Sequence, residues 1–255
     1  MTSPGDLTYG RYLRLDDLLA CQHPLTDSHD ELLFVIIHQA YELWFKQILH
    51  EAAHLQQRLE DGDSAGSLAA ARRIAKILKT VVGQFDILET MTPAQFASFR
   101  PELGSSSGFQ SSQFRYIEAV LGRRDFPVAG IDPALEVIMG RRPVFASLLR
   151  YLRAAGFPVP GEILDQDPRP AWVSNDRVQA LLAQAYARSG DPAEVCEALV
   201  DIDEGIQEWR YRHVKMVERT IGAKSGTGGS SGALYLRGTL GQNLFPDLWA
   251  IRGAL

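Results

Sequence analysis

The sequence of 255 residues has little cysteine, no long apolar run and no cluster of positive charge. Its two cysteines, Cys21 and Cys196, lie far apart and form no CxxC pair, so neither a disulfide framework nor a cysteine metal ribbon is expected. No stretch approaches the roughly 18 uncharged apolar residues of a transmembrane helix, and no apolar run follows a basic start at the N-terminus. These absences predict a cytoplasmic protein in a reducing compartment, without a membrane partner.

The charge balance is also ordinary, with 31 acidic and 26 basic residues and a net charge of -5. Because no basic stripe is present, nucleic acid is not an expected partner. The sequence lacks sustained alternation of apolar and polar residues, which is the pattern of strands, and it has no internal repeat. A hydrophobic content of 45% is enough for a substantial core. The chain is therefore predicted to be all-α.

Helical periodicity is present in three long segments, at about 31–59, 68–91 and 191–222. Ser28 and Glu31 predict an S-x-x-E capping box before the first segment. Shorter helices are expected after Thr92 and at about 109–122, 133–139 and 143–155. Helices of this length favour a bundle with long antiparallel helices, in which ligands bind between facing helices. We predict a single all-α domain over residues 1–255.

Residues 50–54 read HEAAH, the short pattern that places two zinc ligands and a general base on a metalloprotease helix. At about 100° per residue, however, His50 and His54 lie roughly 120 to 160° around the helix from the apolar stripe that contains His38. They share a largely polar face with Gln47 and Gln57, and no obvious third ligand follows. This pattern favours a solvent-facing patch over a zinc site.

Two other histidines fall on apolar faces. His38 lies four residues after Phe34 in the stripe of the first long helix, and His213 lies in the seam of the last one. That seam has alternating spacings of four and three and consists of Val195, Leu199, Ile202, Ile206, Trp209, His213, Met216 and Thr220. A single inward histidine is more often a satisfied core residue than a ligand. Two on separate long helices favour a flat cofactor between them, with one histidine as axial iron ligand.

A further pair suggests recognition of an amino acid. Phe96 and Arg100 are four residues apart, and a guanidinium beside an aromatic ring suits a carboxylate carried on an aromatic body, although a solvated arginine fits equally well. The segment GTGGSSG (226–232) resembles a phosphate-binding loop, but it follows a helix and no Lys-Ser/Thr pair comes after it. It favours a flap that orders over a ligand, or a plain connection.

Several blocks in a fixed order carry a resemblance that covers nearly the whole chain. They are YGRYLRLDDLL (9–19), DELLFVIIHQAYELWFKQILHE (30–51), ILETMTPAQFASFR (87–100), SSGFQSSQFRYIE (106–118), WRYRHVKMVERTIG (209–222) and GTGGSSG (226–232). With these blocks the sequence resembles the tryptophan 2,3-dioxygenase family, whose members are haem enzymes. The region from about 123 to 189 matches poorly.

The resemblance implies roles for the two inward histidines. His213 matches the proximal ligand of the haem iron, and His38 matches the distal histidine that hydrogen-bonds the indole N–H. Phe34 matches an aromatic wall of the indole pocket. The implied cofactor is haem b, held within the helical bundle, and O2 is the implied co-substrate.

The resemblance also implies a site for the amino-acid end of L-tryptophan. Arg100 matches the arginine that binds the carboxylate, and Thr227 matches the threonine that contacts the ammonium and carboxylate groups. Ser107 and Gly108 match a loop that lines the pocket. Phe96 stands where many bacterial members have a tyrosine, and so lacks that hydroxyl contact.

Tyr9, Tyr12 and Leu13 match N-terminal residues that enter a neighbouring subunit's site, which implies a homotetramer. The implied reaction adds both atoms of O2 across the indole C2–C3 bond to give N-formylkynurenine, the first step of tryptophan catabolism by the kynurenine pathway. One alternative is a relative that inserts a single oxygen into tryptophan or a substituted tryptophan. Another is a non-catalytic haem or tryptophan sensor, which would not need Arg100 and Thr227.

Overall fold

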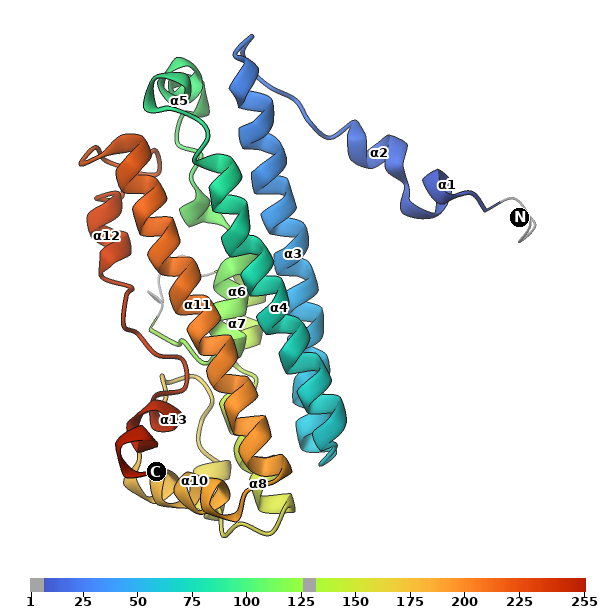
Figure 1. Cartoon of the computed structure of the whole chain (residues 1–255), viewed down its shortest axis with the longest axis vertical. Coiled ribbons are helices and arrows are strands. Elements are labelled where there is room, and N and C mark those ends of the chain that lie inside the picture. The colour runs from blue at the N-terminus through green and yellow to red at the C-terminus, as the bar shows by residue number, and fades with distance from the viewer. Residues whose placement is uncertain (1–6, 126–131) are drawn as a thin grey trace.

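A computed structural model describes residues 7–125 and 132–255, and within these residues every regular element is a helix (Figure 1). Three long helices form the body of the molecule: α3 (His29–Glu60), α4 (Ser64–Leu88) and α11 (Asp191–Ile221). The absence of strands from this part of the chain confirms the all-α prediction. No helix in the two described ranges is long and apolar enough to cross a membrane.

The direction of the long helices follows from their connections and ion pairs. A short turn joins α3 to α4, which run antiparallel as predicted. Arg72 near the start of α4 pairs with Glu194 near the start of α11, and Arg219 pairs with Glu89 where both helices end. Helix α11 is therefore parallel to α4 and antiparallel to α3.

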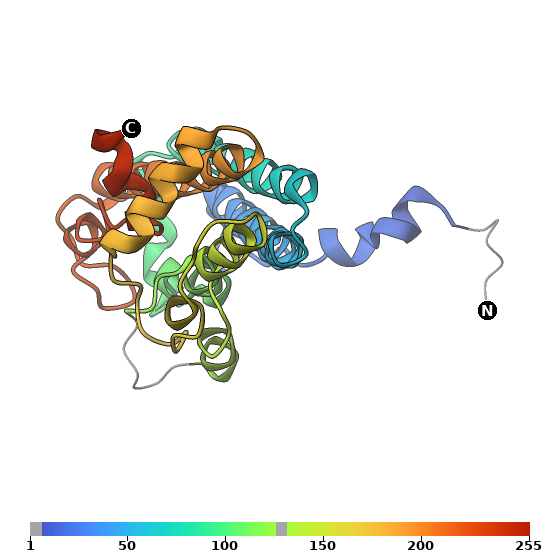
Figure 2. The same ribbon diagram turned by 90° about the horizontal axis from the view of Figure 1, so that it is seen from below.

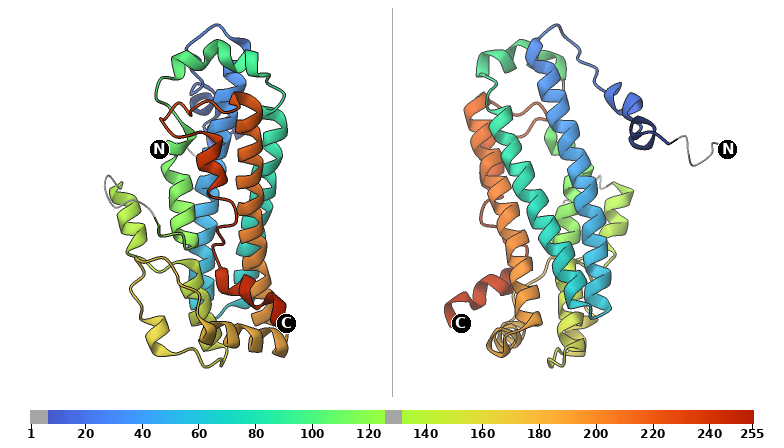
Figure 3. Two further views of the ribbon diagram at one scale, coloured as in Figure 1. Left: turned by 90° about the vertical axis from the view of Figure 1, so that its left-hand side faces the viewer. Right: turned by 45° about the vertical axis from the view of Figure 1, so that its right-hand side comes forward.

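Shorter helices surround this body (Figures 1 and 3). They are α1 (Tyr9–Leu13), α2 (Leu15–Leu19), α5 (Pro93–Phe99), η2 (Arg100–Leu103), η3 (Gly108–Gln110), α6 (Ser112–Leu121), α7 (Pro133–Met139), α8 (Val144–Ala154), α9 (Gly161–Leu164), α10 (Asp176–Arg188), α12 (Ala233–Arg237), α13 (Pro246–Ala250) and η4 (Ile251–Ala254). Helices α6 and α8 pack on α3, and α12 packs on α11. Helices α10 and α13 contact each other at the end where α11 begins (Figure 2).

Two of the predicted helix starts can be compared with the structure. The helix expected after Thr92 is α5, and Thr92 and Gln95 form a capping box at its start. The box predicted for Ser28 and Glu31 is wrong, because the Ser28 side chain caps nothing and its hydroxyl lies 2.9 Å from that of Ser98. The Glu31 carboxylate instead accepts hydrogen bonds from the preceding turn, at Leu25 and Thr26, and these bonds lower its pKa.

The core lies where the long helices meet. The inward seam of α11 is buried in its first half, from Val195 to Ile206, and only partly buried in its second half. Gly205 allows close approach of α4, since a Cβ at that position would meet Leu78 side-chain atoms at 3.0 and 3.1 Å. The α11 seam is therefore closely packed as far as Ile206 and more open beyond it.

The N-terminal helices α1 and α2 extend away from the body (Figures 1 and 2). Gln39 of α3 tethers the segment that follows them, through Gln22 and the carbonyl of Cys21. Apolar side chains of this arm are exposed, including Leu7, Tyr9, Tyr12 and Leu19. The arm thus presents apolar surface that its own chain does not cover.

A buried carboxylate fastens the C-terminal segment to α11. Asp203 is fully buried, and its Oδ2 accepts from the backbone N–H groups of Leu244 and Phe245 at 2.9 and 3.0 Å and from Trp249 Nε1 at 2.9 Å. A single oxygen therefore satisfies three buried donors.

We expect Asp203→Ala to lower the free energy of unfolding by about 3 kcal/mol or more, because three buried donors lose a charged acceptor. Urea denaturation measures this change. Asp201→Ala, at an exposed position on the same helix, is the matched control and is expected to change stability by less than about 0.5 kcal/mol. Equal stability of the two variants would contradict the anchoring role of Asp203.

Candidate functional site

A cavity of about 590 Å³ lies beside the open half of the α11 seam. Its walls come from α3, α4, α5, α6 and α11, from the loop at 104–108 and from the loop at 223–232. Its size falls within the usual range of about 300 to 1,000 Å³ for small-molecule and cofactor sites. Eight residues predicted for the site line it: Phe34, His38, Phe96, Arg100, Ser107, Gly108, His213 and Thr227.

His38 approaches the cavity from α3. Its Nδ1 lies 2.7 Å from the carbonyl oxygen of Phe34, one turn earlier on the same helix. Because a carbonyl can only accept, Nδ1 carries the proton and Nε2 is left as a hydrogen-bond acceptor. Burial lowers the pKa of His38, against the opposing effects of the Phe34 carbonyl and the Glu42 carboxylate. The imidazole is therefore neutral at pH 7.

His213 borders the cavity from α11 and is partly buried. Its ring centroid lies 4.9 Å from that of Trp209, and it stacks on Phe85 of α4 at 6.1 Å. Burial lowers the pKa of His213 to about 4, and the nearby His38 acts in the same direction. The ring is neutral at pH 7, which is the form that binds metals.

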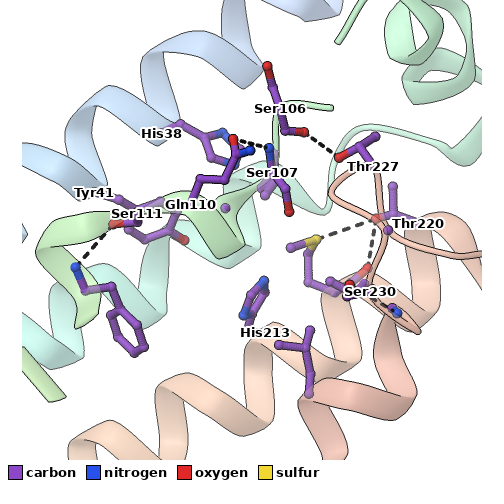
Figure 4. Close-up of a pocket in the computed structure, with 18 of the residues that line it drawn as sticks. His38, Tyr41, Ser106, Ser107, Gln110, Ser111, His213, Thr220, Thr227 and Ser230 are labelled. Carbon is purple, nitrogen blue, oxygen red and sulfur yellow. Dashed lines mark hydrogen bonds between the residues drawn. The ribbon is translucent and has the colours of Figure 1, made fainter. Parts of the chain in front are cut away.

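The two histidines lie on opposite sides of the cavity (Figure 4). Apolar and aromatic side chains line the same cavity, among them Phe34, Phe85 and Phe114. Both inward histidines line one cavity, and they come from separate long helices. Such an arrangement can bind a flat group between two neutral nitrogen ligands or hydrogen-bond acceptors.

Phe34 lies beside His38 and is packed against further aromatic rings. The Phe34 ring centroid lies 4.1 Å from the imidazole, and Phe96 and Phe99 lie 5.7 and 5.5 Å from Phe34. Phe99 is fully buried behind the other two. These rings form an apolar surface suited to a planar aromatic molecule.

Polar groups lie where the loop at 104–108 meets the loop at 223–232, which we call the mouth of the cavity. Arg100 follows the last residue of α5, and its Nη2 donates to the carbonyl of Ser225 at 2.6 Å. The Thr227 hydroxyl donates to the carbonyl of Ser106 (Figure 4). Gly228 allows this contact between loops, because a Cβ there would lie 2.7 Å from the Cβ of Ser107. The arrangement places one guanidinium and one hydroxyl at the mouth.

The HEAAH residues (50–54) do not line the cavity. His50 and His54 are exposed on α3, as predicted. Glu51 is buried between Arg73, whose Nη1 lies 3.0 Å from both carboxylate oxygens, and Gln47, whose amide lies 2.7 Å from one of them. The ion pair of this glutamate with Arg73 therefore joins α3 to α4.

Tyr9, Tyr12 and Leu13 lie on α1 and do not reach the cavity of their own chain. Their side chains are 75%, 72% and 41% exposed. The structure therefore separates these three predicted residues from the other eight.

Several lining residues were not predicted as site residues. Glu118 of α6 is buried and binds Arg210 of α11 at 2.7 Å and Arg123 at 2.9 Å. Trp209 lines the cavity, and its buried Nε1 has no hydrogen-bond partner among the described residues. The apolar periodicity of α11 placed Trp209 inward, but the pairing of Glu118 with Arg210 joins positions 92 residues apart and leaves no local pattern.

Comparison with known proteins shows the family of this chain. The tryptophan 2,3-dioxygenase family matches residues 1–128 and 177–255. A tryptophan 2,3-dioxygenase of Anaeromyxobacter sp. (strain K) is 55% identical over 267 residues, covering 100% of both chains. The enzyme of Herpetosiphon aurantiacus is 49% identical and the match covers 98% of both chains. The enzyme of Caulobacter vibrioides is 41% identical, and the match covers 98% of this chain and 99% of its own. The chain therefore belongs to the tryptophan 2,3-dioxygenase family.

Proposed function

We propose that the protein is a haem-dependent dioxygenase that adds both atoms of O2 across the indole C2–C3 bond of L-tryptophan, giving N-formylkynurenine. The observation that carries this proposal is the pair of neutral histidines across one cavity whose mouth holds Arg100 and Thr227. Full-length relatives named tryptophan 2,3-dioxygenase support it. The reaction is the first step of tryptophan catabolism.

The cavity residues fit haem b. His213 supplies a neutral nitrogen, and the walls of Phe85, Leu88 and Met216 suit an apolar macrocycle. Trp209 Nε1 and Arg210 Nε are buried donors without partners among the described residues, and both residues line the cavity. Propionate carboxylates would satisfy donors of this kind.

When bound, ferrous haem supplies the O2 chemistry, and the protein supplies binding and orientation. His213 would hold the iron from α11. His38, with its proton fixed on Nδ1 by Phe34, offers Nε2 to accept the indole N–H. Phe34 and Phe96 would confine the indole plane and exclude water, so that the substrate presents one edge to the iron side of the cavity.

The amino-acid end of tryptophan would lie at the mouth of the cavity. Arg100 would bind the carboxylate with its fork of N–H donors, and Thr227 would contact the carboxylate and ammonium groups. Both side chains are now bonded to backbone carbonyls of the opposing loop, so substrate would replace or share those contacts. Ser107 and Gly108 border the same mouth, where the absence of a side chain at Gly108 leaves room for the ligand.

The exposed N-terminal arm supports a homotetramer in which Tyr9, Tyr12 and Leu13 complete a neighbour's site. These side chains are apolar in large part and uncovered in a single chain. Two tyrosines and a leucine suit the edge of a pocket that encloses an aromatic substrate.

The product mass tests the proposed reaction. Haem-loaded, reduced protein given L-tryptophan and labelled O2 is expected to yield a product heavier by two labelled oxygen atoms, as measured by mass spectrometry. His213→Ala is expected to lose the haem absorption spectrum, whereas the exposed His54→Ala is the control that keeps it. A product with one added oxygen, or normal haem binding without His213, would contradict the proposal.

Arg100→Ala is expected to lower kcat/KM for L-tryptophan by roughly 30-fold to several thousand-fold. Truncating one partner of a desolvated charge pair costs about 2 to 5 kcal/mol, and each 1.4 kcal/mol is about a factor of ten. Phe96 has no hydroxyl with which to replace the lost contact. Steady-state kinetics measure the change.

An indole that lacks the amino-acid end is the control substrate for Arg100→Ala, because it gains nothing from the guanidinium. Parent and variant are expected to bind it about equally weakly. Tryptophan kinetics within about twofold of the parent would show that Arg100 does not bind the carboxylate.

Deletion of residues 1–14 is expected to weaken substrate affinity and assembly together, because it removes the three residues proposed to enter a neighbour's site. Sedimentation measures the assembly, and KM for L-tryptophan measures the affinity. A fully active monomer would refute the proposed role of the arm.

A further inference from the structure

Glu42 places a carboxylate at the wall of the cavity, one turn after His38 on α3. Residues four apart share a face of a helix, with about 5 to 6 Å between their Cβ atoms. The side chain of Glu42 is only partly exposed. Its negative charge acts on the imidazole and raises the pKa of His38, against the larger opposite effect of burial. The carboxylate therefore lies within electrostatic reach of the ring.

Gln113 of α6 fixes the position of this carboxylate. Its side-chain amide donates to Glu42 Oε2 and also to the main-chain carbonyl oxygen of Glu42, both at 2.8 Å. Because the amide is neutral, it orients the carboxylate without cancelling the negative charge. The bond to the carbonyl also joins α6 to the backbone of α3, one turn from His38.

The two carboxylates that line the cavity differ in their partners. Glu118 is paired with both Arg123 and Arg210. Glu42 forms no ion pair with any residue in the described ranges. The other titratable side chains of the cavity wall are Tyr41, Arg100, Arg115, His213 and Tyr235. Within this part of the chain, Glu42 is therefore the cavity carboxylate whose charge no cation neutralises.

The charge of Glu42 bears on the acceptor atom of His38. Since Nδ1 is bonded to the carbonyl of Phe34, Nε2 is the atom left to accept a hydrogen bond. A nearby negative charge favours positive charge on the ring and so makes Nε2 a stronger acceptor. The effect is larger beside an apolar cavity than in water. Because His38 is neutral at pH 7, the result is a stronger hydrogen bond and not a protonated ring.

We propose that Glu42 is a positioning residue that acts through His38: its carboxylate, held by Gln113, strengthens the hydrogen bond that His38 Nε2 accepts from the indole N–H. This inference rests on the proposed function. The interaction acts through space, so it depends on the charge of the side chain at position 42 and not on a direct contact with the imidazole.

Two substitutions separate charge from shape. Glu42→Gln keeps the length and an acceptor for Gln113 but removes the charge, whereas Glu42→Asp keeps the charge. In the reduced, carbon monoxide-saturated holoenzyme, which is diamagnetic, NMR titration measures the pKa of His38. We expect this pKa to fall by about 0.5 or more in Glu42→Gln, because the imidazolium loses a stabilising charge, and to stay near the parent value in Glu42→Asp. Glu208→Gln, at an exposed position outside the cavity, is the matched control and is expected to leave it unchanged.

Ligand binding at pH 8 without O2 provides a second measurement. We expect Glu42→Gln to raise the dissociation constant of L-tryptophan about threefold or more, since the acceptor for the indole N–H is weaker. The control ligand is 1-methyl-L-tryptophan, which has no indole N–H. Its dissociation constant is expected to be the same in the parent and in Glu42→Gln.

The outcomes separate this inference from the function on which it rests. A parent protein that oxidises no tryptophan would overturn the proposed function and the role of Glu42 with it. An unchanged His38 pKa, or unchanged binding of L-tryptophan, in Glu42→Gln would overturn the role of Glu42 alone. Equal effects of Glu42→Gln and Glu42→Asp, or equal weakening of both ligands, would also overturn it, since the shape of the side chain would then matter and not its charge.

Discussion

His38 and His213 reach one cavity from α3 and α11, and both of these helices pack on α4. Removing two imidazoles from water lowers both pKa values, so the rings stay neutral while facing each other. Two protonated rings at this separation would repel each other and could not bind a metal. Phe85 of α4 contributes to this environment directly, because it stacks on His213 and contacts Tyr41. The apolar enclosure built by α4 is thus the condition on which the proposed chemistry depends.

The sequence predicted the elements whose signal is local. The seam from Val195 to Thr220 follows helical periodicity, so the inward position of His213 follows from residue spacing alone. The helix start after Thr92 is also local, since Thr92 and Gln95 are three residues apart and cap α5 together. The capping box predicted for Ser28 and Glu31 did not form because the Glu31 carboxylate bonds to the preceding turn. There it accepts hydrogen bonds from both the backbone N–H and the hydroxyl of Thr26. A four-residue pattern contains no information about such competition.

Other features depend on contacts between distant segments. Helix α10 lies in the region of about 123–189 that the sequence blocks matched poorly, although the family match resumes at residue 177. Helix α13 packs against α10 from more than fifty residues away. The Glu118–Arg210 pair joins α6 to α11, and the Tyr41 hydroxyl is left unpartnered by rings that come from several helices. Family resemblance could supply roles for Arg100 and Thr227, but their bonds to the opposing loop carbonyls depend on how two distant loops meet.

The parallel course of α4 and α11 has an electrostatic consequence. Aligned peptide dipoles give each helix a partial positive charge at its start and a partial negative charge at its end, so two parallel neighbours place like charges together. Side chains oppose this effect: Asp191 and Glu194 lie in the first turn of α11, and Arg219 in its last turn. Arg219 also reaches Glu89 at the end of α4, so its positive charge lies close to both negative helix ends. Mobile ions screen such compensation, so the stability of this helix pair depends on ionic strength.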